Sequence, residues 1–132
     1  MKNHVLQKKL VDLLNDRFTT SESTLVNFSK GEDVYDPVKP QAVVFPTTNK
    51  EISEILKLCN EHNTPVVPYG TGTSLEGHAV GIAEGITISL EKFDKILSVY
   101  PDDFDCRVEA NVTREQLNEN LKDKGVFFPI DP

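Results

Sequence analysis

Tryptophan is absent from this sequence of 132 residues, and aromatic residues make up only 8% of it. A chain so poor in aromatic side chains offers no platform on which bases would stack. Clusters of basic residues are missing as well, since 14 Lys and Arg stand against 21 Asp and Glu, for a formal net charge of −7. Because binding to phosphate backbones depends on clustered cations, the sequence argues against a nucleic-acid partner.

Long apolar runs are also lacking. None approaches the roughly 20 residues that a transmembrane helix needs, and the N-terminal MKNHVLQKKL has no apolar segment typical of a secretory signal. Cysteine occurs twice, as Cys59 and Cys106, at a spacing that suits neither a CxxC motif nor a metal site. We expect no transmembrane segment and no bound metal. We interpret both cysteines as reduced and buried, which favours a cytoplasmic location.

The remaining composition, with 38% apolar residues, is that of an ordinary soluble domain. Apolar residues at helical spacing predict a helix over residues 4–16, with Asn3 as its N-cap. Residues 19–40 show no sustained period and are predicted to be an irregular connector. Packing of three side chains is expected to order this connector: Leu25, Phe28 and Tyr35.

A β-α-β unit is predicted after the connector. The apolar run 42–45 indicates a short buried strand, and a capping box from Thr48 to Glu51 begins an amphipathic helix. Asn63 is placed to end this helix, and the next strand begins at Val66. Because a helical crossover joins them, the two strands are expected to be parallel.

Three more strands and a helix follow in the pattern. Residues 86–90 alternate as in a half-buried strand, and 96–100 and 106–112 read as a hairpin. In its second strand one face is expected to carry four apolar residues: Cys106, Val108, Ala110 and Val112. Thr113 with Gln116 forms a second capping box, and Gly125 stands where a C-cap glycine would. The fold class is therefore α/β (α+β): a small sheet with a β-α-β unit and a following hairpin, flanked by helices.

A glycine-rich stretch, PVVPYGTGTSLEGH at residues 65–78, follows the strand signal of Val66. It is not a Walker A loop, G-x-x-x-x-G-K-[ST]. Gly72 and Gly77 have the required separation, but His78 and Ala79 replace the lysine and the hydroxyl residue. The side chain that would reach the phosphates is therefore missing.

The Rossmann fingerprint, G-x-G-x-x-G opening a helix, fails as well. Leu75 occupies the third glycine position, and the glycine-rich EGHAVGIAEG that follows is a poor helix. What remains is a turn whose consecutive backbone N–H groups form an anion-binding concavity, for which the pyrophosphate of a cofactor is the natural ligand. The alternative is a tight surface loop without a ligand.

The run VVPYGTGTSLEGH closely resembles the first FAD-binding segment of the vanillyl-alcohol oxidase flavoprotein superfamily, also called the PCMH-type FAD-binding domain. The resemblance is greatest to its branch of glycolate oxidases and D-lactate dehydrogenases. It extends through PQAVVFPTTNKEISEILKLCNEHNTPVVPYG upstream and VEANVTREQLNENLKDKGVFFPIDP downstream, about residues 37–132. It implies that residues 37–132 are the first, pyrophosphate-binding subdomain, preceded by a helix and connector over residues 1–36.

The resemblance also implies which residues contact FAD. The matching loop positions are Pro68, Tyr69, Gly70, Thr71, Gly72, Thr73, Ser74, Gly77 and His78, and Pro129 and Asp131 are expected to approach the cofactor. Thr73 stands where some members carry a histidine bonded covalently to flavin, so FAD is expected to be non-covalent. For His78, a polar contact to FAD and a plain surface position both remain open. Glu76 is expected to bond loop amides rather than act as a base, because a pyrophosphate would repel its carboxylate.

Members of this branch oxidise small 2-hydroxy acids, such as D-lactate or glycolate, by hydride transfer to FAD. No catalytic residue is expected in this chain, because substrate and base residues lie in a later part of such proteins. The apolar VFFPI near the end suggests a piece of a longer polypeptide, inactive alone, whose partner is the remainder of that polypeptide. The alternative is a non-catalytic binding module that docks onto a separate flavoprotein. Whether the exposed half-domain associates with itself stays open.

Overall fold

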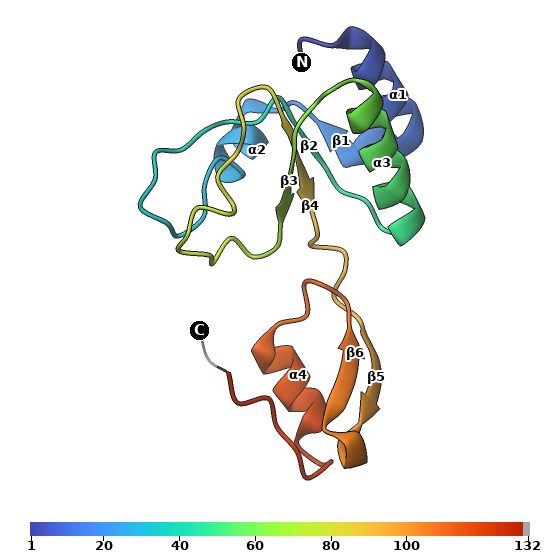
Figure 1. The fold of residues 1–132 in the computed structure, drawn as a ribbon, viewed down its shortest axis with the longest axis vertical. Helices are drawn as coiled ribbons and strands as arrows, with labels where there is room; N and C mark the ends of the chain where they lie inside the picture. The colour runs from blue at the N-terminus through green and yellow to red at the C-terminus, as the bar shows by residue number, and fades with distance from the viewer. Residues whose placement is uncertain (131–132) are drawn as a thin grey trace. The chain divides into compact units, whose positions relative to one another are not determined.

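The computed structural model describes residues 1–130. The chain divides into two compact units, Met1–Lys92 and Phe93–Pro132, and each unit has a sheet of its own (Figure 1). Among the described residues, no helix combines the length and the apolar character that crossing a membrane requires.

The first unit is built on a four-stranded sheet in the order β1-β2-β4-β3. Its strands are β1 (Phe18–Thr19), β2 (Ala42–Val44), β3 (Val66–Tyr69) and β4 (Ile86–Ser89). β2 and β3 both run parallel to β4, whereas β1 is antiparallel to β2. The predicted parallel arrangement of the β-α-β unit is confirmed, with β4 inserted between its two strands.

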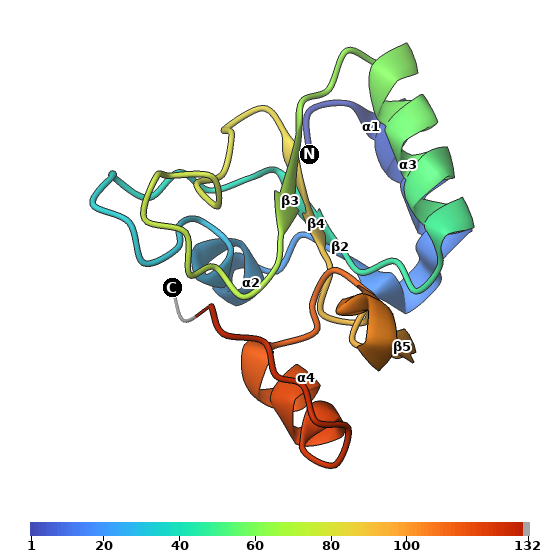
Figure 2. The same cartoon turned by 60° about the horizontal axis from the view of Figure 1, so that its bottom comes forward.

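The strand predicted at 86–90 is confirmed as β4, but the prediction that it is half-buried is wrong. All residues of β4 are buried, including Thr87 and Ser89, which are 0% and 1% exposed. β4 is a central strand, and both faces of the sheet are covered: α1 (His4–Leu14) and α3 (Asn49–Glu61) lie on one side and α2 (Glu22–Asn27) on the other (Figure 2). The alternation of apolar and polar residues in β4 predicted that one face of the strand would be exposed to solvent. The sequence does not show that a helix covers this second face of the sheet.

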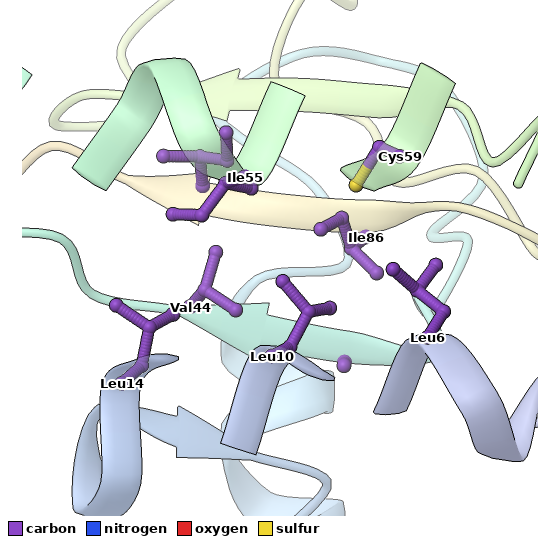
Figure 3. Packing of buried hydrophobic residues seen from close by; sticks show 9 residues of the cluster. Leu6, Leu10, Leu14, Val44, Ile55, Cys59 and Ile86 are labelled. Atoms are coloured by element: carbon purple, nitrogen blue, oxygen red, sulfur yellow. The ribbon is translucent and has the colours of Figure 1, made fainter. Parts of the chain in front are cut away.

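The core lies between the sheet and two helices, α1 (His4–Leu14) and α3 (Asn49–Glu61). Leu6, Leu10 and Leu14 recur on one face of α1 and pack with Ile55 and Cys59 of α3 in one cluster over the sheet (Figure 3). This interdigitated apolar layer holds both helices against one face of the sheet.

The predicted helix boundaries follow local chemistry. Asn3 Oδ1 accepts the Leu6 N–H at 3.0 Å, and Thr48 Oγ1 accepts the Glu51 N–H at 3.1 Å, so both predicted N-caps are confirmed. Just after α3, Asn63 has a φ of 48°, a left-handed conformation that asparagine tolerates and that ends the helix as predicted.

The connector is more ordered than its sequence predicts. Residues Glu22–Asn27 form a short helix, α2, so the prediction of an irregular segment is wrong there. Tertiary packing explains the difference, because Phe28 packs edge-on against Phe45 and Tyr69 at ring distances of 5.8 and 4.7 Å. The expected packing of Phe28 is confirmed, whereas the side chain of Tyr35 is 54% exposed.

The second unit contains the predicted hairpin and helix. β5 (Ile96–Tyr100) pairs antiparallel with β6 (Asp105–Val108) across a turn at Pro101–Asp103, and α4 (Arg114–Leu121) follows. The Thr113 cap is confirmed, since its Oγ1 accepts the Gln116 N–H at 3.1 Å. Gly125 adopts a φ of 73° shortly after the helix end.

β6 is shorter than the pattern 106–112 predicts. It ends at Val108, so the single apolar face from Cys106 to Val112 is wrong. The register shifts between Ile96 and Ser98, and beyond β6 the Val112 N–H turns back to the Glu109 carbonyl at 3.1 Å. A bulge and a turn break the strict alternation on which the prediction rested.

Candidate functional site

The glycine loop begins where edge strand β3 ends, at Gly70, and runs without helix or strand to β4. It thus lies at the carboxyl end of a parallel strand, the edge at which open α/β sheets bind ligands. The absence of a helix after the loop agrees with the exclusion of a Rossmann arrangement.

Consecutive backbone donors are free in this loop. Among residues 1–130, the N–H groups of Thr71, Gly72, Thr73 and Ser74 have no protein acceptor. The hydroxyl oxygens of Thr71 and Thr73 lie 3.4 Å apart, and both residues are exposed. A run of free N–H groups flanked by hydroxyl groups can receive the oxygens of an anion without any lysine.

Two loop positions require glycine. Gly72 and Gly77 each have a φ of +76°, in the left-handed region. A Cβ on Gly72 would collide with the hydroxyl of Tyr69, and one on Gly77 would lie 2.7 Å from the ring of Tyr35. The loop shape therefore depends on glycine through both backbone conformation and space.

The far end of the loop is closed by a hydrogen bond between Ser74 Oγ and His78 Nδ1, 3.0 Å apart. The Glu76 N–H donates to the same Ser74 oxygen at 3.4 Å. In the described part of the chain the Glu76 carboxylate makes no hydrogen bond, so the expected bond to loop amides is not formed. Among residues 1–130, no carboxylate is hydrogen-bonded to His78 to orient its ring, as a hydrolase triad requires.

Tyr69 connects the loop to the connector. Its hydroxyl donates to the Lys30 carbonyl at 3.1 Å. Burial first, and then the negative charges of Asp33 and Glu32, raise the pKa of Tyr69. Neighbouring Pro68 is exposed on the edge strand.

The other predicted contact residues lie elsewhere in the chain. Pro129 is an exposed residue of the second unit, whereas all the predicted loop positions belong to the first. Asp131 lies outside the described residues. Within residues 1–130, no group of three or more His, Cys, Asp and Glu side chains is arranged to hold a metal ion.

The sequence did not single out residues 30–35, which contact the glycine loop although they lie far from it in sequence. The Glu32 N–H donates to the Gly72 carbonyl at 2.9 Å, and the two segments lie side by side in Figures 1 and 2. Gly31, in an otherwise featureless connector, was the available signal, because a glycine often marks a close approach of two backbones.

Free backbone donors at the carboxyl end of a parallel strand are suited to a phosphate-bearing cofactor. Neutral donors in a glycine turn fit the pyrophosphate of a dinucleotide. The chain belongs to the FAD binding domain family, whose model matches residues 40–132. FAD as the cofactor, and the α/β class with a small sheet flanked by helices, are thereby confirmed.

Among curated relatives, a probable mitochondrial D-lactate dehydrogenase of Danio rerio is 40% identical over 103 residues, covering 78% of this chain and 21% of the relative. The glycolate oxidase subunit GlcD of Bacillus subtilis is 33% identical over 93 residues, covering 70% of this chain and 20% of that protein. The expected relationship to this branch is confirmed. The chain spans only about a fifth of the length of these relatives.

Solved structures show the same fold at low identity. Alkyldihydroxyacetonephosphate synthase superposes with a TM-score of 0.86 at 16% identity, covering 100% of this chain and 27% of the synthase. p-Cresol methylhydroxylase superposes with a TM-score of 0.72 at 23% identity, covering 91% of this chain and 24% of the hydroxylase.

Proposed function

We propose that this chain is the pyrophosphate-binding part of an FAD-linked oxidoreductase that oxidises a small 2-hydroxy acid. The observation that carries the proposal is the run of free N–H groups from Thr71 to Ser74 at the carboxyl end of β3, in a chain of an FAD-binding family. The relatives' names point to the substrate class, because D-lactate and glycolate are both 2-hydroxy acids.

In this proposal the loop backbone donates hydrogen bonds to the two phosphates, and the threonine hydroxyls add neutral donors. Bound FAD would supply the hydride acceptor, while this chain orients it. Thr73 cannot form the covalent flavin bond of a histidine, so binding is non-covalent. The proposed contact set comprises Pro68, Tyr69, Gly70, Thr71, Gly72, Thr73, Ser74, Gly77, His78 and Pro129.

Substrate and base residues belong to the remainder of the parent polypeptide, which would be this chain's partner. Residues 37–132 would form the first subdomain of the FAD domain, with residues 1–36 as its helix and connector. A cytoplasmic location is part of the proposal and suits two free cysteines. The Danio rerio relative is named as mitochondrial, so fractionation of the native host decides between these compartments.

An FAD titration of the chain, followed by flavin fluorescence and by amide NMR signals, tests the proposal. We expect affinity weaker than micromolar, because so much of a relative's length is absent, together with shifts of the Thr71–Ser74 amide signals. Sub-micromolar affinity would overturn the need for the remaining polypeptide. Unmoved loop signals at millimolar FAD would overturn the loop as the site.

A pair of matched variants sharpens this test. Gly72→Ala introduces a Cβ at a φ of +76° and against Tyr69, and should abolish the FAD-induced shifts. Gly125→Ala carries a similar backbone strain at a φ of +73°, but its Cβ would meet nothing within 4 Å. The Gly125 variant should bind as the wild type does.

A further inference from the structure

We infer that residues 30–35 are positioning residues that aim the loop amides at the anion, through a hydrogen bond to the Gly72 carbonyl. This inference rests on the proposed function of the glycine loop. It concerns a segment that is 35 or more positions earlier in the chain and carries no motif.

The central contact fixes one peptide plane of the loop. The Glu32 N–H donates to the Gly72 carbonyl at 2.9 Å. In a trans peptide the carbonyl of Gly72 and the N–H of Thr73 share a plane and point in opposite directions. Holding the carbonyl toward Glu32 therefore turns the Thr73 N–H away from the connector, and this N–H has no protein acceptor among residues 1–130.

Close backbone approach makes this contact possible. A Cβ on Gly31 would collide with the Gly72 carbonyl oxygen and would lie 3.1 Å from the Cβ of Ala79. Gly31 thus lets the connector lie directly against the loop. Glycine is needed at position 31 for steric reasons and not for its backbone conformation, because Gly31 is not among the residues with positive φ.

Further contacts hold the same two segments together at other points. The Tyr69 hydroxyl donates to the Lys30 carbonyl at 3.1 Å, and the ring of Tyr35 fills the space beside Gly77. The Gly81 N–H donates to the Ser29 carbonyl at 3.2 Å. The connector therefore supports the loop from its start to beyond its end.

Asp33 shapes the connector itself. It is only 6% exposed, and its carboxylate oxygens accept the N–H groups of Gly31 at 3.1 Å and Tyr35 at 3.0 Å. These two bonds bend residues 31–35 into a tight turn that presents the Glu32 N–H to the loop. A buried carboxylate is tolerated because both oxygens are hydrogen-bonded.

Two variants test the inference in the 132-residue chain. Gly31→Ala should displace the Gly72 carbonyl by steric contact, and Asp33→Asn should loosen the turn, since one amide oxygen cannot replace two carboxylate oxygens. The matched control is Asp36→Asn, at an exposed carboxylate directly after the segment. This control should behave as wild type.

The measurements are an ADP titration by amide NMR, the exchange protection of the Glu32 amide and the urea midpoint of the first unit. ADP carries the diphosphate without the flavin, so it reports on the loop alone. Both variants should lower ADP affinity about tenfold or more, the contribution of one charge-assisted hydrogen bond. They should also lower Glu32 protection and reduce the ADP-induced shift of Thr73, at an unchanged urea midpoint.

The outcomes are distinguishable. Wild-type ADP affinity in a variant that has lost Glu32 protection overturns the inference and leaves the proposed function standing. A loss of affinity matched by a lower urea midpoint in both variants also overturns it, because the role would then be structural only. If the wild-type chain shows no loop shifts at millimolar ADP, the proposed function fails and the inference with it.

Discussion

The ion pair between Arg17 and Glu51 should make the stability of the first unit depend on pH in the acidic range. Arg17 Nη1 and Nη2 each donate to a Glu51 carboxylate oxygen at 2.7 Å, and the Thr47 N–H donates to the same carboxylate at 2.7 Å. The hydrogen bond from Arg17, opposed by burial and aided by Thr47, lowers the pKa of Glu51 from 4.5 to about 2. This difference corresponds to about 3 kcal/mol by linkage. The side chains of the pair are 29% and 18% exposed, so screening leaves about 1–2 kcal/mol.

The sign follows from the lowered pKa. The stabilisation is complete above pH 4.5, the ordinary value, and is lost as the pH falls from there toward the folded value of about 2. Glu51→Gln should therefore be less stable than wild type by about 1–2 kcal/mol at pH 7 and nearly equal to it near pH 2.

Urea denaturation at pH 7, 4 and 2.5, followed by NMR signals of the first unit, measures this difference. Following one unit avoids averaging over the separate unfolding of the second. Glu54→Gln is the control, because within residues 1–130 Glu54 forms an ion pair with Lys57 alone, on the exposed face of α3. A difference between wild type and Glu51→Gln that is the same at pH 7 and pH 2.5 would refute the reasoning, as would no difference at pH 7.

Three further predictions concern packing, capping and thiol chemistry. Leu10→Ala, at a core position 0% exposed, should lower the free energy of unfolding by about 3 kcal/mol in urea. Thr48→Ala removes the α3 N-cap and should cost about 1 kcal/mol in the same assay, whereas the exposed Ser53→Ala should cost almost nothing. Cys59 is buried as expected, whereas Cys106 is only partly buried, so that expectation is wrong for Cys106. Burial raises the pKa of Cys59 to about 11, so a thiol reagent at pH 8 should label Cys106 and leave native Cys59 unmodified. Equal labelling of both thiols in the folded protein would contradict the burial of Cys59.

Local chemistry carried the successful structural predictions. The caps at Asn3, Thr48 and Thr113 depend on a side-chain oxygen three residues from its N–H donor, so the sequence alone is sufficient. The prediction of the β-α-β unit succeeded for a similar reason, because a helical crossover between strands almost always makes them parallel.

The structural predictions were wrong where contacts with segments distant in sequence determine the local structure. β4 alternates in sequence as a half-buried strand does, yet helices cover both faces of its sheet, which no local pattern reveals. α2 has six residues, too few to be stable by propensity, and exists because Phe28 packs against Phe45 and Tyr69.

The sequence by itself determined the kind of loop. Glycines and hydroxyl residues after a strand, without a lysine or a following helix, predict an anion cradle made of backbone, and the longer match places the chain in an FAD-binding family. Only the tertiary structure decided what holds that cradle open. The Glu32 N–H reaches the Gly72 carbonyl from 40 positions away at 2.9 Å, and Gly31, which marks a close backbone approach, does not tell which distant segment will lie there. A chain encodes which groups are able to donate, but the direction in which they donate depends on segments that folding brings together.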